Sequence, residues 1–221
     1  MKNFILAFPF VQTEIDLLEG PFLMPGCTIS FTGKKQNQVF GLEEVFLNHA
    51  PLEESEREKI KNHKVLYFLQ GEFKTVEEFE SLNRVISQIL EMGALGIYME
   101  NSGAAWSAAS FLEWIEHEDP MHAWLNFIET AEDLYTLGME TFGRPDLCVR
   151  LHHGEKEELQ TALVDVAESL FLEESVFDTG VVIQLESSLV GYEIYKETKQ
   201  PYSKDSMEHN RKGVWRLVPK K

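Results

Sequence analysis

Two stretches of this chain repeat the order strand, helix, strand, and this repetition constrains the fold more than any other feature. Apolar runs at 65–69 and 94–99 flank one amphipathic segment, and runs at 147–151 and 181–185 flank another over 155–174. Apolar residues recurring every three or four positions predict helices lying on a sheet, and short apolar runs predict buried strands. We therefore expect an α+β fold with two pseudo-repeated strand–helix–strand units, loosely ferredoxin-like in each half.

The connections within these units leave the sheet type open. A strand–helix–strand crossover usually joins parallel strands, whereas loosely ferredoxin-like halves would be mainly antiparallel. A mixed or antiparallel sheet covers both possibilities. No Pro-rich or Gly/Ser-rich linker separates the halves. We therefore expect residues 1–221 to form one compact body, or two packed lobes of about 1–120 and 121–221.

Local signals refine the expected elements. Thr75 and Glu78 form a capping-box pattern that predicts the start of the first amphipathic helix. Between the two units, the pattern predicts a helix over 104–116 and a strand over 124–128. The polar stretch at 196–212 predicts a loop.

The charge balance restricts the partners of the chain. Asp and Glu number 37 against 20 Lys and Arg, giving a net charge of −17. Such a surface repels nucleic acids and anionic membranes but attracts a basic protein, although it could also serve solubility alone. Basic residues gather near the C-terminal end, as Arg211, Lys212, Arg216, Lys220 and Lys221. These residues either bind the acidic body or a partner, or lie in solvent.

The two cysteines indicate a reducing compartment. Cys27 and Cys148 are far apart and form no C-x-x-C pattern, so neither a disulfide framework nor a structural metal site is expected. No cofactor is expected either. The apolar run at 4–11 predicts a first strand rather than a targeting segment, and no run is long enough to cross a membrane. We expect a cytoplasmic protein.

One motif resembles a known family. Gly138 begins the run G-M-E-T-F-G-R-P-D, which ends at Asp146 and is followed by a predicted strand. This run resembles an uncharacterised bacterial family known only as a domain of unknown function, and the likeness covers mainly residues 94–185. The resemblance implies a bacterial cytoplasmic protein and supplies no catalytic residues.

The strongest candidate site is the small-residue stretch 99–110, between a predicted strand and a predicted helix. Backbone N–H groups at such a helix start can bind an anion, and small residues permit close approach. Glu100, Asn101, Ser102 and Trp106 are the candidate ligand-binding residues. The alternative is that Asn101 or Ser102 caps the helix and the alanines pack on the sheet.

Other polar residues form weaker candidates. Glu140 is a second acid–base candidate because it too lies in a Gly-bounded stretch. The remaining candidates are the histidine pairs His152 with His153 and His117 with His122. Neither pair has the H-E-x-x-H spacing, and adjacent histidines on a strand point to opposite faces, so no metal site is expected.

Together these features favour a binding protein. An acidic surface without an assembled catalytic motif indicates a protein-binding factor of the immunity or adaptor type. The alternative is a small hydrolase or ligand-binding enzyme that uses the strand–turn–helix at 99–110. A scaffold or homodimer without a ligand is the third interpretation.

Overall fold

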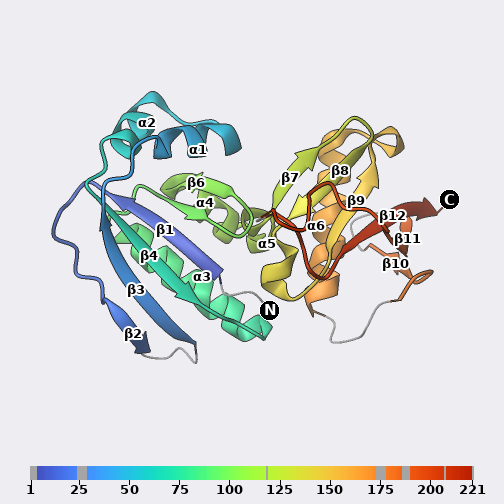
Figure 1. Cartoon of the computed structure of the whole chain (residues 1–221), viewed down its shortest axis with the longest axis horizontal. Coiled ribbons are helices and arrows are strands. Elements are labelled where there is room, and N and C mark those ends of the chain that lie inside the picture. Colours follow the sequence, from blue (N-terminus) through green and yellow to red (C-terminus); the bar gives the residue numbers. More distant parts are fainter. Residues whose placement is uncertain are drawn as a thin grey trace. The chain divides into compact units, whose positions relative to one another are not determined.

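The structure is a computed structural model with two compact units, Met1–Trp124 and Leu125–Lys221. It describes residues 4–23, 29–117, 119–172, 178–185, 190–206 and 208–220. Each unit has its own six-stranded sheet with helices packed against it (Figure 1). The predicted α+β class is therefore confirmed. Among the described residues, no helix has the length and apolar character needed to span a membrane.

The sheet of the first unit is antiparallel throughout. Its strands, in spatial order, are β2 (Gly20–Leu23), β3 (Ser30–Asn37), β4 (Val65–Gly71), β1 (Phe4–Phe10), β5 (Gly96–Met99) and β6 (Ala104–Ser107). Strand β1 pairs antiparallel with both β4 and β5, so these two strands run in the same direction with β1 between them. Helix α3 (Val76–Glu91) joins β4 to β5. This is the split strand–helix–strand arrangement of ferredoxin-like folds.

Helices cover both faces of this sheet. Successive strand residues point to opposite faces, so Phe4 and Ala7 of β1 serve different cores. Phe4 lies with Phe73 and Trp124 in an aromatic cluster that α3 joins through Phe79. On the other face, Ala7 packs in a core with helices α1 (Leu42–His49) and α2 (Glu54–Lys61).

The local signals for α3 are confirmed. The Thr75 hydroxyl accepts the Glu78 N–H at 3.2 Å, as an N-cap does. The Glu78 carboxylate accepts the N–H of Lys74 at 2.6 Å, one residue before the expected capping-box partner. Gly93 follows the helix with φ +102°, a backbone conformation that favours glycine.

The predicted helix over 104–116 is wrong at its start. Residues Ala104–Ser107 form β6, and only Ala108–Glu116 form a helix, α4. A short helix, α5 (Pro120–Trp124), ends the first unit. The strand predicted at 124–128 is β7 (Asn126–Glu129), which begins the second unit.

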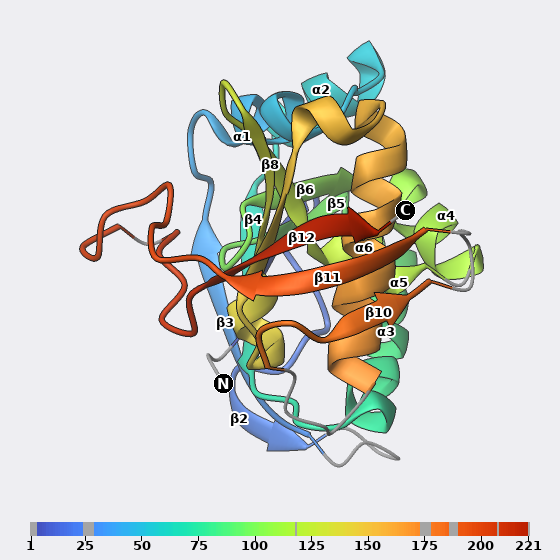
Figure 2. The ribbon, with the colours of Figure 1, turned by 90° about the vertical axis from the view of Figure 1, so that its right-hand side faces the viewer.

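The second unit has a mixed sheet. Its strands, in spatial order, are β10 (Val182–Gln184), β11 (Gly191–Lys196), β12 (Val214–Lys220), β9 (Asp146–Arg150), β8 (Asp133–Leu137) and β7. The β9–β12 pair is parallel, and the other pairs are antiparallel. Helix α6 (Lys156–Leu172) follows β9 and packs behind β10, β11 and β12 in Figure 2.

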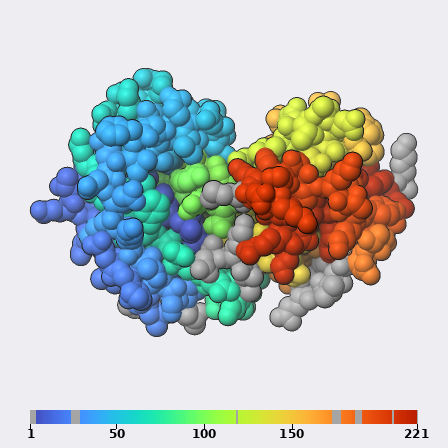
Figure 3. Space-filling model, in the orientation of Figure 1, coloured from blue at the N-terminus to red at the C-terminus, as the bar shows by residue number. Residues whose placement is uncertain are grey.

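The two faces of the mixed sheet differ in character. Leu134, Val149 and Leu217 are in register and buried on one face. The neighbouring positions, which point to the other face, carry Asp133, Arg150 and Arg216. The connection from β11 to β12, residues 197–213, has no helix or strand in its described part, as predicted, and spreads over the surface of this unit in Figure 3. Two 3-10 turns, η1 (Met139–Phe142) and η2 (Leu151–His153), flank β9.

Candidate functional site

The predicted strand–turn–helix at 99–110 is a β-hairpin instead. Strands β5 and β6 pair directly, with Met99 opposite Ala104. Helix α4 begins only at Ala108, and the Ser107 side chain caps it by accepting the Ser110 N–H at 3.3 Å. The helix start that was expected to bind an anion near Ser102 is therefore not at that position.

The turn residues Glu100, Asn101 and Ser102 make contacts within the unit. The Asn101 Oδ1 accepts the N–H of Ile5 at 2.9 Å, and the Glu100 N–H donates to the Ile5 carbonyl at 3.0 Å. The Ser102 side chain is buried, and its hydroxyl accepts the Ala104 N–H at 3.3 Å. These bonds fasten the hairpin to β1, and whether the residues also bind a ligand stays a prediction.

Trp106 belongs to a row of aromatic rings that contact one another. Its indole N–H donates to the Ala123 carbonyl at 2.8 Å. Its ring lies 5.7 Å from that of Trp114 and 4.5 Å from that of His49, and Trp114 stacks on His122 at 4.1 Å. Two edge-to-face contacts and a stacked pair are favourable packing geometries, so Trp106 ties α1, β6 and α4 together.

The predicted pair of adjacent histidines, His152 and His153, does not have the expected geometry. His152 and His153 lie in the 3-10 turn η2, and their rings are 4.3 Å apart rather than on opposite faces of a strand. Burial, followed by the charge of His152, lowers the pKa of His153. Within the described part of the chain, no three His, Cys, Asp or Glu side chains are grouped as a metal site would require.

The family-like motif at 138–146 forms the turn η1 and its anchor. Gly138 and Gly143 flank the turn with φ values of +118° and +71°, which explains the two glycines. Asp146 is buried and its carboxylate accepts the Met139 N–H at 3.1 Å. Burial raises the pKa of Asp146 to about 7, against hydrogen bonds that favour the charged form.

Glu140 links this turn to the β11–β12 connection. It is buried, and it accepts the Nε of Arg211 at 2.7 Å and the backbone N–H of Arg211 at 3.2 Å. Asn210 adds a bond from its amide to the Arg144 carbonyl at 3.0 Å. Glu140, the second acid–base candidate, therefore holds the β11–β12 connection by pairing with Arg211. Arg211 is one of the basic residues for which contact with the acidic body was an expected alternative.

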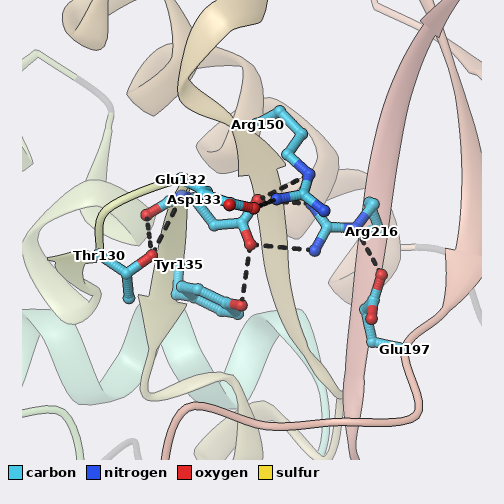
Figure 4. Close-up of polar contacts among 7 residues, drawn as sticks. All are labelled: Thr130, Glu132, Asp133, Tyr135, Arg150, Glu197 and Arg216. Carbon is cyan, nitrogen blue, oxygen red and sulfur yellow. Dashed lines mark hydrogen bonds and ion pairs between the residues drawn. The ribbon is translucent and has the colours of Figure 1, made fainter.

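A network of charged groups occupies the sheet face opposite α6 (Figure 4). Arg216 makes a bidentate pair with Asp133, at 2.6 and 3.1 Å, and also binds Glu197. Arg150 lies 3.4 Å from Asp133 and pairs with Glu132. Tyr135 donates its hydroxyl hydrogen to Asp133 at 3.2 Å. Six side chains from three strands and two adjoining loops thus form one connected set.

The charges in this network are mutually stabilised. Burial opposes ionisation of Asp133, but hydrogen bonds and charge from Arg216 outweigh it and lower the pKa of Asp133. Burial raises the pKa of Tyr135 to about 12 and that of the neighbouring Cys148 thiol to about 12. Neither Tyr135 nor Cys148 therefore ionises near neutral pH. Cys27, the second cysteine, lies outside the described residues.

A recess beside α6 combines apolar and charged walls. It has a volume of about 480 Å³, within the range of ligand sites. Its apolar lining includes Leu159 and Ala162 of α6, with Leu185 and Tyr192 from the β10–β11 region. All four belong to the second unit, and we call this recess the α6 groove.

Carboxylates line one wall of the α6 groove. Glu158 and Asp165 are seven residues apart, so both lie on the groove side of the helix. Burial and then the charges of Glu158 and Asp165 raise the pKa of Tyr192. An apolar floor beside two negative charges suits a cation with an aliphatic stem, such as Lys or Arg.

Neither the charged network nor the groove was predicted from the sequence. Asp133, Arg150 and Arg216 are distant in sequence, and only the sheet register brings them together. For the groove, the i, i+7 spacing of Glu158 and Asp165 beside apolar positions was a usable signal. It was not distinctive, because exposed carboxylates occur on most helices of this chain.

Comparison with known proteins gives no relative for this chain. No protein-family model, no curated protein and no solved structure matches it. The resemblance of the 138–146 motif to an uncharacterised bacterial family stays an expectation, and the chemistry of the site rests on its own residues.

Proposed function

We propose that this is a cytoplasmic binding protein that docks a basic segment of a protein partner in the α6 groove. The observation that carries this proposal is the meeting of an apolar floor with the carboxylates of Glu158 and Asp165. A Lys or Arg side chain can lay its methylene stem on Leu159 and Tyr192 and place its charge between the carboxylates.

Charge supports the same partner at longer range. A net charge of −17 attracts a basic protein and raises its association rate, particularly at low salt. His153, also in the groove lining, has a lowered pKa and is mainly neutral at pH 7. It therefore does not repel a cation at that pH.

The test is capture of partners from the protein's own cell lysate, compared between variants. We expect the wild-type protein to retain a stoichiometric basic partner at low salt and to release it at high salt. The double variant Glu158→Gln/Asp165→Asn should bind this partner at least about tenfold more weakly, as the loss of one to two charge-assisted contacts implies. The affinity is then measured with the purified partner.

A matched control removes the same charge elsewhere on the helix. Glu155→Gln/Glu157→Gln also neutralises two carboxylates near the start of α6, but neither residue lines the groove. Binding by this variant should stay close to wild type. Equal weakening by both double variants would mean that net charge, and not the α6 groove, determines binding. A lysate without any basic partner would contradict the proposed function.

A further inference from the structure

A second recess of the same unit has the opposite charge from the α6 groove. It has a volume of about 320 Å³ and lies where the segment before β9, the segment after α6 and the paired ends of β11 and β12 meet. Its lining includes the cations Arg144, Lys196 and Lys212 together with Trp215. We call it the basic recess.

Three cations around one hollow are unexpected in so acidic a chain. Like charges at short range repel, and they are stabilised when an anion lies between them. The lining has one described carboxylate, Asp178, whose Oδ1 accepts the backbone N–H of Thr179 at 2.8 Å. Among the described lining residues, the two lysines alone outnumber this carboxylate.

Lys196 and Lys212 differ from those basic residues of this unit that form ion pairs. Arg150, Arg211, Arg216 and Lys220 each pair with a carboxylate. For Lys196 and Lys212, by contrast, no ion pair with a carboxylate occurs within the described ranges. Both are exposed, so their charges are available to a ligand.

Backbone hydrogen bonds fix the walls of the recess. Lys196 lies directly opposite Trp215 in the β11–β12 ladder, and the Glu197 N–H donates to the Val214 carbonyl at 2.8 Å. The Arg144 N–H donates to the Met139 carbonyl at 3.0 Å. Since these walls are already formed, little ordering is needed when a ligand binds.

We propose that the basic recess binds a small organic phosphate that carries a flat ring, of about the size of a mononucleotide. Lys196 and Lys212 can bind a phosphate through charge-assisted hydrogen bonds, and Arg144 lines the same recess. The half-buried indole of Trp215 offers a face on which a ring can stack. The volume is at the lower end for ligand sites, which fits a single nucleotide.

The test is titration of the full chain with AMP at low salt, by calorimetry. We expect saturable binding of one AMP, weakened at least about tenfold in Lys196→Gln/Lys212→Gln, as the loss of charge-assisted bonds implies. The matched control is Lys199→Gln/Lys204→Gln, which removes two charges from the neighbouring connection and should bind AMP like the wild type. Adenosine, without the phosphate, should bind far more weakly.

Two further probes separate the phosphate from the ring. Ribose 5-phosphate and inorganic phosphate should compete with AMP only weakly, and Trp215→Phe should weaken AMP binding less than Trp215→Ala. Equal affinity for ribose 5-phosphate and AMP would contradict the role of Trp215. Equal weakening by the two lysine double variants, or no AMP binding at millimolar concentration, would overturn the site.

This inference is independent of the α6 groove. Glu158→Gln/Asp165→Asn should leave AMP affinity unchanged, because neither residue lines the basic recess. A wild-type protein that binds AMP but captures no basic partner would therefore contradict only the proposed function. A wild-type protein that captures the partner but does not bind AMP would contradict only the basic recess.

Discussion

At the scale of single residues, Arg216 shows how the fold determines the role of a charge. In the sequence it belongs to a basic C-terminal segment that could lie in solvent or bind the acidic body. In the structure its side chain is only 13% exposed and Asp133 faces it across β9. The hydrogen bonds to Asp133 raise the pKa of Arg216 further above its ordinary value, so its guanidinium is charged at neutral pH.

We predict that Arg216→Met lowers the free energy of unfolding by about 3 kcal/mol, because it leaves the Asp133 carboxylate buried without its main partner. Urea denaturation measures the change. Arg57→Met is the control: its pair with Glu44 is largely exposed, so the loss should stay below about 1 kcal/mol.

A double variant checks the cause. If an uncompensated carboxylate is responsible, Arg216→Met/Asp133→Asn should be more stable than Arg216→Met alone, since the remaining carboxamide carries no charge. A double variant that is less stable than the single one would show that Arg216 acts mainly through its packing or through Glu197.

At the scale of elements, secondary structure was predicted correctly where the sequence signal is local. The prediction failed where tertiary contacts determine the conformation. The α3 cap was predictable because Thr75 and Glu78 are three residues apart. Ala104, Ala105 and Ser107 are small and compatible with a helix, but pairing with β5 makes residues 104–107 a strand. Apolar periodicity located the strands β4, β5 and β9 but not their order, because β1 and β12 enter the sheets from distant parts of the sequence.

The β5–β6 hairpin has a tight contact that can be tested. A Cβ on Gly96 would lie 2.4 Å from the Trp106 carbonyl oxygen and 2.7 Å from a ring carbon of Phe46. We predict that Gly96→Ala destabilises the protein by about 1–3 kcal/mol, because the backbone of β6 cannot move away without breaking its pairing. Thermal or urea unfolding gives the measurement.

Gly154→Ala is the matched control for this substitution. Its nearest heavy atoms would be 3.4 Å away, at ordinary contact distance, and its backbone is extended. It should change the free energy of unfolding by less than about 0.5 kcal/mol, or stabilise slightly by restricting the unfolded chain. Similar losses for the two alanine variants would contradict the steric explanation at Gly96.

At the scale of the whole molecule, the pH dependence of stability is the sum of contributions from several titrating groups, and these contributions have opposite signs. His122 and His153 have lowered pKa values, mainly through burial, so stability rises with pH until the unfolded-state pKa of each histidine is passed and is constant above it. Asp133 has a lowered pKa, so its contribution is present above its unfolded-state value and is lost only in acid. Asp146 is the exception, because its pKa is raised to about 7.

Because its pKa is raised, Asp146 makes stability fall as the pH rises, whereas the histidines make stability rise with pH. Between its unfolded-state pKa near 3.8 and about 7, the folded protein holds a proton that the unfolded chain has released. Folding therefore loses stability as the pH rises through this window, by at most about 1.4 kcal/mol per pH unit for one proton. The cause is structural: Asp146 is buried beside Glu140, and both carboxylates hold the turn η1 and the loop above it.

Asp146→Asn isolates this contribution, because the histidines and Asp133 titrate equally in both proteins. We predict that the stability of the variant relative to the wild type rises between pH 5 and pH 7 and then stays constant to pH 8. Urea midpoints at each pH give the difference. A difference that is flat from pH 5 to pH 7 would mean that Asp146 ionises at its ordinary pKa. The hydrogen bonds from Met139 and Asn210 would then outweigh burial, and the β11–β12 connection would rest on a charged anchor.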